Sequence, residues 1–196
     1  MNFTDEFTIE IRQSQMHSYS GMIEGDYSNA AFLDAFNLTG SDVNISNLNP
    51  ESLQGDRVYR EYFAELSKGM PTLDISDCPD LGPILFALAS MKNGAVFTGT
   101  ERLKAKESNR GMAMHEELTK LGGGLIFGNN TITVPGQTLK YRGIPLSGHN
   151  DHRIVMAMSV ILSAIGGTID GAEAVRKSYP GFFEDIQKLG AKVDIK

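Results

Sequence analysis

The residues most able to do chemistry lie at positions 103–110, which read Leu-Lys-Ala-Lys-Glu-Ser-Asn-Arg. This octet carries three cations, Lys104, Lys106 and Arg110, directly before a run with a helical pattern. The carboxylate of Glu107 lies among them, and residues three or four positions apart share a helix face. A charged octet is commonly a solvated surface. Here the cations could bind an anion while the carboxylate moves a proton.

Two further charged stretches lie downstream. Residues 150–153 read Asn-Asp-His-Arg, and residues 176–180 read Arg-Lys-Ser-Tyr-Pro. If the fold gathers these stretches on one face, that face carries a cationic patch made of Lys104, Lys106, Arg110, Arg153, Arg176 and Lys177. On a chain of net charge -6, such a local patch indicates a surface for a small, highly anionic ligand.

The composition excludes several other classes of function. The net charge of -6 and the pI near 5.2 argue against nucleic acid or an anionic membrane as a partner. No apolar run is long enough to span a bilayer, and the first residues lack the pattern of a signal peptide. Cys78 is the only cysteine, and no Cys/His cluster has metal-ligand spacing. We therefore expect a cytoplasmic protein without disulfides and without a metal site.

Three segments that must position these side chains share one order of elements. In each we expect an Asp at the N-cap, followed by a helix of small and apolar residues; the three are Asp26, Asp80 and Asp151. The helices after Asp80 and Asp151 are apolar almost all round, which predicts burial on most sides. Three such units suggest three-fold pseudosymmetry. Their positive helix ends would then converge on one face and attract anions.

After each of these helices we expect a glycine, a short strand and a second, amphipathic helix. The strands are predicted at 43–45, 95–97 and 168–170, and the second helices open at 53–56, 106–110 and 176–180. Pro180 suits the first turn of the last helix. Two apolar faces are predicted, one made of Met114, Leu118 and Leu121 and the other of Phe182, Ile186 and Leu189.

The units are expected to close with further strands. A hairpin is predicted over 124–134, and a last strand over 191–195. Asp26 and Asp80 are 54 residues apart, whereas Asp80 and Asp151 are 71 apart, so the first unit has no room for the hairpin. Residues 8–12 alternate like a strand ahead of the first unit.

The charged motifs, taken in order, resemble the C-terminal domain of the EPSP synthase (3-phosphoshikimate 1-carboxyvinyltransferase) family. They are Pro79-Asp80, residues 106–110, residues 150–153 and residues 176–180, and Asn109 stands where the family usually has Asp. The resemblance implies an α/β (α+β) fold: an inverse α/β barrel-like domain of three pseudosymmetric β-α-β-α-β-β units with buried helices, the first abbreviated. It assigns residues 21–196 to that domain, and residues 1–20 to a terminal strand and crossover from a missing N-terminal domain.

The resemblance also implies a reaction and its residues. The family moves the carboxyvinyl group of phosphoenolpyruvate onto the 5-hydroxyl of shikimate 3-phosphate, releases phosphate and needs no cofactor. The implied catalytic residues are Asp80 (acceptor of the hydroxyl proton), Glu107 (acid or base at the methylene carbon) and Lys177 (proton relay). The implied substrate-binding residues are Lys106, Arg110, Arg153, Lys177, Asp80 and Arg102. The implied partners are these two anionic substrates and the N-terminal domain.

Other interpretations stay open at this point. The related UDP-N-acetylglucosamine 1-carboxyvinyltransferases share the fold, although the motifs at 106–110 and 150–153 favour the shikimate enzymes. The domain could also bind anions without catalysis. Asp151 is expected to act as a helix cap, His152 as a structural hydrogen-bonding group, and Cys78 as a small buried filler. We expect negligible turnover from this chain alone, and we expect Arg110→Ala to impair phosphoenolpyruvate use more than folding.

Overall fold

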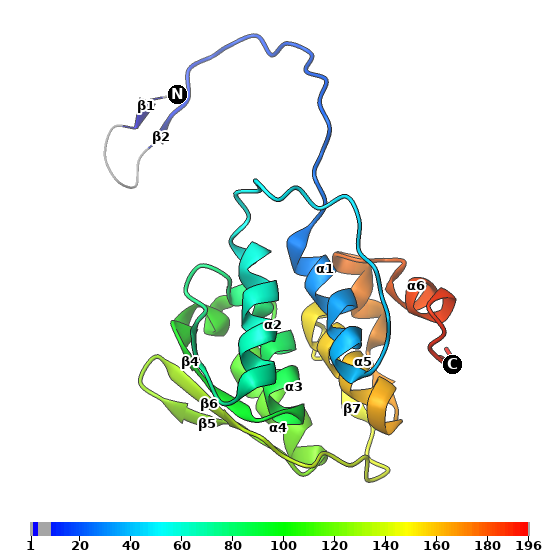
Figure 1. Ribbon diagram of the computed structural model, residues 1–196. Helices are drawn as coiled ribbons and strands as arrows, with labels where there is room; N and C mark the ends of the chain where they lie inside the picture. The colour runs from blue at the N-terminus through cyan, green and yellow to red at the C-terminus, as the bar shows by residue number, and fades with distance from the viewer. Residues whose placement is uncertain (1, 4–8, 196) are drawn as a thin grey trace.

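The computed structural model describes residues 2–3 and 9–195, in which helices and strands follow one another along the chain (Figure 1). The α-helices are α1 Tyr27–Asp34, α2 Tyr59–Lys68, α3 Gly82–Met91, α4 Arg110–Lys120, α5 His152–Ile165 and α6 Phe182–Lys188. The strands are β1 Asn2–Phe3, β2 Ile9–Glu10, β3 Thr72–Asp74, β4 Gly94–Thr98, β5 Ile126–Gly128, β6 Thr131–Pro135, β7 Leu146–Ser147 and β8 Ile169–Asp170. Short 3-10 helices lie between them: η1 Ala35–Thr39, η2 Gly55–Val58, η3 Pro79–Leu81, η4 Thr100–Ala105 and η5 Ala172–Lys177. The fold is mixed α/β.

The centre of the fold is the pair of helices α3 and α5. Every residue of α3 from Gly82 to Ser90 is buried, and so is every residue of α5 from His152 to Ile161. The two helices pack against each other, with α1 beside α5 and α2 beside α3 (Figure 1). This confirms that the two apolar segments are buried on most sides. Although both are apolar, no helix in the described part of the chain has the length and apolar composition that crossing a membrane requires.

A four-stranded sheet in the order β3-β4-β6-β5 packs against α3. Strands β3 and β4 are parallel, and the other pairs are antiparallel. The ring of Phe86 in α3 meets that of Phe97 in β4 edge-on, with 4.9 Å between centroids. The β5–β6 hairpin turns through Asn130, which has a positive φ of 49°. The hairpin and the strand at 95–97 are therefore confirmed.

Each first helix is followed, after a 3-10 helix, by an amphipathic second helix. η2 leads into α2, η4 precedes α4 and η5 precedes α6, close to the predicted openings. The predicted face of α4 is buried, as are Phe182 and Ile186 of α6. Leu189 is 53% exposed because it lies at the C-cap, beyond the last turn of α6. Pro180 precedes the N-cap Gly181, so placing it in the first helical turn was wrong.

Two predicted strands are wrong, and side chains explain both. Residues 43–45 form no strand because the Asn37 amide binds the backbone of Val43, with Oδ1 accepting from its N–H at 2.6 Å and Nδ2 donating to its carbonyl at 2.8 Å. Residues 191–195 form no strand either. The N–H of Ala191 bonds to the carbonyl of Ile186, and the Gln187 amide donates to the carbonyl of Val193. Backbone groups used in this way cannot join a ladder.

The predicted helix caps are confirmed at two of three places. Asp26 accepts from the N–H groups of Ser28 and Asn29 at the start of α1, and Asp151 accepts from the N–H of Arg153 at the start of α5. Asp80 is not a cap, because it lies inside η3, one residue after Pro79, where its backbone is already helical. Its carboxylate is therefore available to side chains from other elements.

The segment before α1 runs away from the rest of the molecule (Figure 1). β2 pairs antiparallel with β1, and residues 11–26 form no helix or strand. Only residues 9 and 10 of the predicted strand at 8–12 are in a strand, and Thr8 lies outside the described residues. Tyr19 and Met22 are 94% and 99% exposed. The division at residues 20 and 21 stays a prediction.

Phe97→Ala should lower the free energy of unfolding by about 3–5 kcal/mol, because it empties a fully buried site between the sheet and α3. Urea unfolding followed by circular dichroism measures the change. Phe127→Ala is the matched control, since Phe127 lies in the same sheet and is 45% exposed. Equal losses from the two substitutions would contradict this packing.

Candidate functional site

The guanidinium of Arg110, the first residue of α4, lies at the centre of a group of charged side chains. Arg110 is fully buried. Its Nε donates to Asp151 Oδ2 at 2.9 Å, its Nη1 to Asp80 Oδ1 at 2.6 Å, and its Nη2 to Glu107 Oε2 at 2.6 Å. Burial alone would lower the pKa of Arg110, but its bonds to Asp151 and Asp80 outweigh this and raise the pKa. One cation thus joins η3, the loop before α4, and the start of α5.

Asp80 connects this guanidinium to further cations. Its Oδ1 lies 3.0 Å from Lys106 Nζ, and its Oδ2 lies 3.1 Å from Arg153 Nη2. Burial raises the pKa of the Asp80 carboxyl, but Arg153 and the hydrogen bonds from Lys106 and Arg110 outweigh it and lower the pKa to about 2. The structure therefore brings together five predicted site residues, Asp80, Lys106, Glu107, Arg110 and Arg153. We call these five, together with Asp151, the ionic cluster.

Asp151 has a second role besides capping α5. Its side chain is fully buried, and its Oδ2 accepts from both Arg110 Nε and Ser108 Oγ, the latter at 3.0 Å. Burial raises its pKa, yet the bonds from Arg110 and the N–H of Arg153 outweigh this and lower the pKa. Capping alone was expected of Asp151, so its ion pair with Arg110 was missed. No local spacing could reveal a partner 41 positions away in the sequence.

Arg153 is the member of the cluster whose buried donors lack partners among the described residues. Arg153 is 7% exposed, and its Nη2 donates to Asp80. Its Nε and Nη1 are buried and have no hydrogen-bond partner among the described residues. Buried guanidinium nitrogens normally have partners, so these two donors are suited to the oxygens of an anion such as a carboxylate or phosphate.

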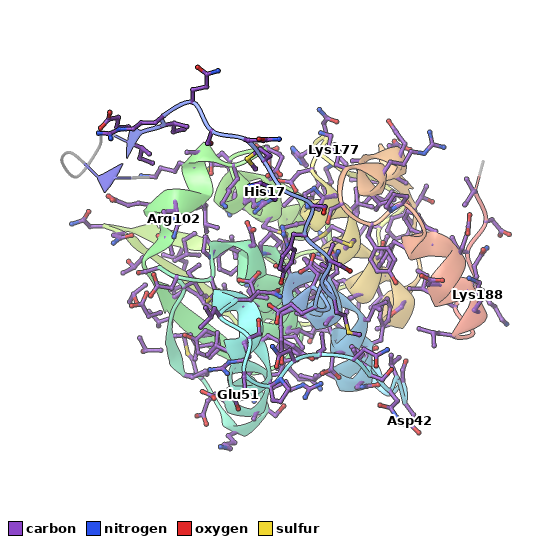
Figure 2. The ribbon with its side chains drawn as sticks, turned by 90° about the horizontal axis from the view of Figure 1, so that it is seen from above. His17, Asp42, Glu51, Arg102, Lys177 and Lys188 are labelled. Carbon is purple, nitrogen blue, oxygen red and sulfur yellow. The ribbon has the colours of Figure 1, made fainter. Side chains whose placement is uncertain are left out.

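Lys177 and Arg102 lie near the cluster without touching its carboxylates. Lys177 Nζ, at the end of η5, donates to the carbonyl of Asn150, the residue before Asp151. Arg102 Nη1, in η4, donates to the carbonyl of Ser76 at 2.8 Å. Figure 2 labels both on separate ribbons, Arg102 on the green η4 and Lys177 beside the orange η5. The structure thus places Lys177 of η5 in contact with the turn before α5, and Arg102 of η4 in contact with the loop before η3.

Cys78 keeps the role expected of it, whereas the neighbouring His152 does not show the hydrogen bond expected at its Nδ1. Cys78 is 2% exposed, and burial raises the pKa of its thiol to about 12, so it is a packed side chain and not a thiolate nucleophile. Burial and Arg153 lower the pKa of His152, which keeps the ring neutral near neutral pH. Its Nδ1 lies 4.0 Å from Glu107 Oε1 and makes no hydrogen bond among the described residues. The hydrogen bond expected of His152 is therefore not made at this nitrogen.

The ionic cluster lies apart from two hollows in the described part of the chain. Two hollows of about 340 Å³ and 170 Å³ lie elsewhere, one against α6 and one between η4 and the β5–β6 hairpin. Neither is lined by Asp80, Arg110 or Arg153. The outer side chains of the cluster are partly open, with Asp80 31% and Glu107 38% exposed. A ligand would therefore meet carboxylates and cations at the surface, with Arg110 beneath them.

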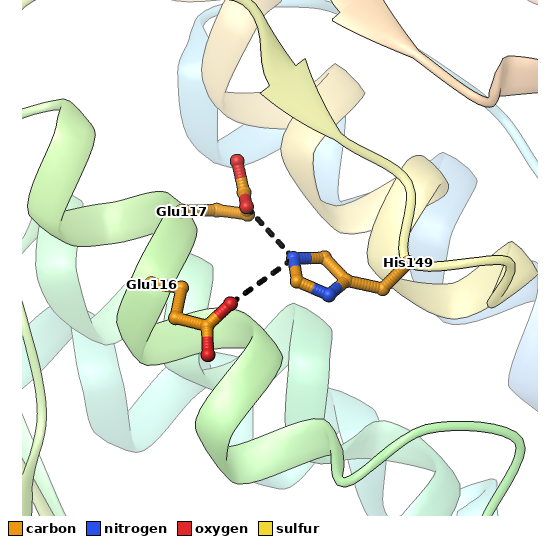
Figure 3. Close-up of side chains that lie close together, drawn as sticks. All are labelled: Glu116, Glu117 and His149. Carbon is orange, nitrogen blue, oxygen red and sulfur yellow. Dashed lines mark hydrogen bonds and ion pairs between the residues drawn. The ribbon is translucent and has the colours of Figure 1, made fainter.

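A second group, Glu116, Glu117 and His149, was not found from the sequence (Figure 3). His149 Nε2 lies 2.7 Å from Glu117 Oε1 and 3.8 Å from Glu116 Oε2. One donor atom from each residue lies within 4.8 Å of the others, as metal ligands would. Both oxygens of Glu117 are already held by Lys120 Nζ, at 3.0 and 2.8 Å, so we assign no metal to this group.

The arrangement suits proton transfer beside a bound anion. Carboxylates that stay ionised can accept protons, and the adjacent cations can neutralise a phosphate or carboxylate. The two functions meet at Asp80, which contacts three cations at once.

Comparison with known proteins gives one consistent result. The family model described as EPSP synthase (3-phosphoshikimate 1-carboxyvinyltransferase) matches residues 2–186. Curated proteins named 3-phosphoshikimate 1-carboxyvinyltransferase match from Clostridium kluyveri, 36% identical over 88% of this chain and 45% of that protein, and from Methanocella arvoryzae, 36% identical over 88% and 46%. A solved EPSP synthase from Acinetobacter baumannii aligns with a TM-score of 0.55 at 20% identity, covering 89% of this chain and 42% of that one. The chain spans about half the length of the curated relatives it matches.

The pKa of Asp80 predicts a pH-dependent contribution to stability. Because its folded pKa of about 2 lies below the unfolded value of 3.8, its stabilising effect is present above pH 3.8 and is lost as the pH falls toward 2. At about pH 5, Asp80→Asn should lower the free energy of unfolding by about 1–2 kcal/mol, a figure reduced for partial exposure.

Urea unfolding of wild type and Asp80→Asn between about pH 5 and pH 2 measures this difference. Asp42→Asn serves as the control, since Asp42 lies on an exposed loop. A gap between wild type and Asp80→Asn that stays constant down to pH 2 would show that Asp80 is not held ionised by the cluster.

Proposed function

The chain belongs to the EPSP synthase family, and we propose that it forms the C-terminal domain of a 3-phosphoshikimate 1-carboxyvinyltransferase. The complete enzyme would transfer the carboxyvinyl group of phosphoenolpyruvate to the 5-hydroxyl of shikimate 3-phosphate and release phosphate. The observation that carries the proposal is the pair of unused, buried nitrogens on Arg153, beside a carboxylate held ionised at Asp80. That pairing supplies an anion site and a proton acceptor in one place.

We infer the finer architecture from the repeated helix pairs. They would be the cores of three β-α-β-α-β-β units in an inverse α/β barrel-like domain, with the first unit abbreviated. The hairpin β5–β6 follows α4, whereas α2 leads directly to the single strand β3, which fits the shorter first unit. Residues 21–196 would form this domain, and residues 1–20 would pass to the N-terminal domain. The exposed Ile11 and Tyr19 support that reading, because apolar side chains of this kind suit a contact with another domain.

Asp80 would accept the proton of the attacking hydroxyl. In the cluster its pKa of about 2 makes it a weak base, because three cations hold its oxygens. An anionic substrate that draws Arg153 and Lys106 away would remove part of this stabilisation and raise the pKa. Substrate binding would thus strengthen the base at the moment it is needed.

Glu107 would serve the methylene carbon of phosphoenolpyruvate. Its Oε2 is fixed by Arg110, while the side chain remains 38% exposed toward solvent. Lys177 would contact the same substrate and relay a proton, and Arg102 and Lys106 would face shikimate 3-phosphate. The donors of the N-terminal domain would complete both substrate sites.

The role of Arg110 differs from a simple substrate clamp. Its nitrogens bind Asp80, Glu107 and Asp151 and its side chain is 1% exposed, so we assign it to holding the carboxylates in place. Removing it would leave three carboxylates without their central cation, and breaking buried pairs of this kind typically costs about 3–5 kcal/mol. Arg110→Ala would therefore damage folding together with activity, which revises the expectation from sequence. Arg153 is the sharper probe of substrate binding.

The proposed reaction is tested by mixing this chain with the N-terminal domain of a related enzyme and measuring phosphate release from the two substrates. Release is expected from the mixture, and negligible release from this chain alone, because half of the substrate ligands would be absent. Appreciable turnover by the chain alone would contradict the division into two halves. A folded complex that releases no phosphate would favour a domain that binds anions without catalysis.

In the active mixture, Arg153→Lys should reduce kcat/KM for phosphoenolpyruvate by about 10- to 100-fold, because lysine cannot bind Asp80 and also place a second and third donor as the planar guanidinium does. Arg176→Lys is the matched control, since Arg176 lies on the exposed side of η5. Steady-state kinetics with each substrate varied in turn gives the comparison. If the two variants lose activity equally, or if neither loses activity, Arg153 does not bind the phosphoenolpyruvate anion.

A further inference from the structure

Helix α4 contacts the turn before α5 at two points. Arg110, at its first position, holds Asp151, and Glu117 lies seven residues later, about two helical turns along the same face. Glu117 is 1% exposed although it carries a carboxylate. Its Oε2 accepts from the backbone N–H of Ser147 at 2.8 Å, and its Oε1 accepts from His149 Nε2 at 2.7 Å. Figure 3 shows His149 reaching from the loop after β7 toward α4.

The turn that Glu117 contacts has an unfavourable backbone. His149 and Asn150 have φ values of 48° and 52°, so two consecutive residues other than glycine are left-handed. L-residues disfavour this region, and such conformations persist only where surrounding contacts hold them. The N–H of Gly148 bonds to the carbonyl of Asp170 at 2.7 Å, and that of Asp151 to the carbonyl of Gly148 at 2.8 Å. From α4, the side chain of Glu117 adds two further contacts, to the N–H of Ser147 and to His149 Nε2.

The same turn carries two hydrogen-bond acceptors, one for Lys177 and one for Arg110 of the ionic cluster. The carbonyl of Asn150 accepts from Lys177 Nζ, and the carboxylate of Asp151 accepts from Arg110. Both lie directly after His149 in the chain. A change in the backbone at His149 therefore moves the acceptors of a proposed catalytic lysine and of the central arginine.

We propose that Glu117 is a positioning residue, which holds the turn at 147–151 so that Asp151 meets Arg110 and Asn150 meets Lys177. This rests on the proposed function for its effect on turnover, but the geometric part stands on the contacts alone. Lys120 neutralises the buried carboxylate, with Nζ within 3.0 Å of both oxygens and 3.4 Å from the carbonyl of Pro145. Glu117 thus contacts Lys120, His149 and Ser147 at the same time.

Glu117→Gln keeps the size of the side chain and removes its charge. Glu116→Gln is the matched control, since Glu116 is the neighbouring residue on α4, its side chain is 56% exposed, and it lies farther from His149. His149→Asn is a second variant: asparagine tolerates a left-handed backbone but is too short to keep the contact. Because the His149 side chain is 22% exposed, this variant tests the contact between Glu117 and His149 even if Glu117→Gln does not fold.

The first measurement uses the chain alone. Two-dimensional NMR should show shifted amide signals for Asn150 and Asp151 and a shifted Nε–H signal for Arg110 in Glu117→Gln and His149→Asn, and unchanged signals in Glu116→Gln. Identical spectra for the three variants would overturn the proposal, and so would changes confined to residues outside 147–151 and Arg110.

The second measurement uses the active mixture. Glu117→Gln and His149→Asn should lower kcat by about tenfold with little change in KM, because displaced catalytic groups slow the chemical step. A lower melting temperature with wild-type kcat would mean a purely structural role and overturn the proposal. If the wild-type mixture releases no phosphate, the proposed function fails. The NMR result still decides whether Glu117 positions the turn at 147–151.

Discussion

The buried guanidinium of Arg110 is the interaction on which the site depends. It joins carboxylates from η3, from the loop before α4 and from the N-cap of α5, at distances of 2.6 to 2.9 Å. A charge this deeply buried is tolerated only when it is paired and hydrogen-bonded, and each of its nitrogens has a carboxylate partner. The starts of α4 and α5 are therefore tied to η3. The apolar packing of α3 against α5 then sets where that junction lies.

The ionic cluster is balanced in charge before any ligand binds. Three carboxylates, Asp80, Glu107 and Asp151, meet three cations, Lys106, Arg110 and Arg153. Two anionic substrates would bring further negative charge to it, so other cations must compensate. Lys177 supplies some of this positive charge, and the proposed N-terminal domain would supply the rest. Under the proposed function, the same reasoning explains why this chain alone should bind the two substrates weakly.

Five of the six members of the ionic cluster were predicted from the sequence, through the resemblance of the charged motifs to a known family. The two buried helices and the hairpin were also predicted from the sequence, because they follow from the local pattern of apolar and turn-forming residues. The errors come from individual side-chain and backbone contacts that a pattern of residue types does not reveal. Residues 43–45 look like a strand, but the Asn37 amide occupies the backbone of Val43. The ion pair of Asp151 with Arg110, and the contact of Glu117 with His149, join residues 41 and 32 positions apart, which no spacing rule detects.

The coupling between Arg110 and Asp151 tests this account most directly. A double-mutant cycle with Arg110→Gln, Asp151→Asn and the double variant, followed by urea unfolding, measures it. Because each single substitution leaves a buried partner unpaired, the double variant should be more stable than the sum of the single losses predicts, by at least about 2 kcal/mol. Additive losses, with a coupling below about 0.5 kcal/mol, would contradict the claim that one shared cation holds the site together.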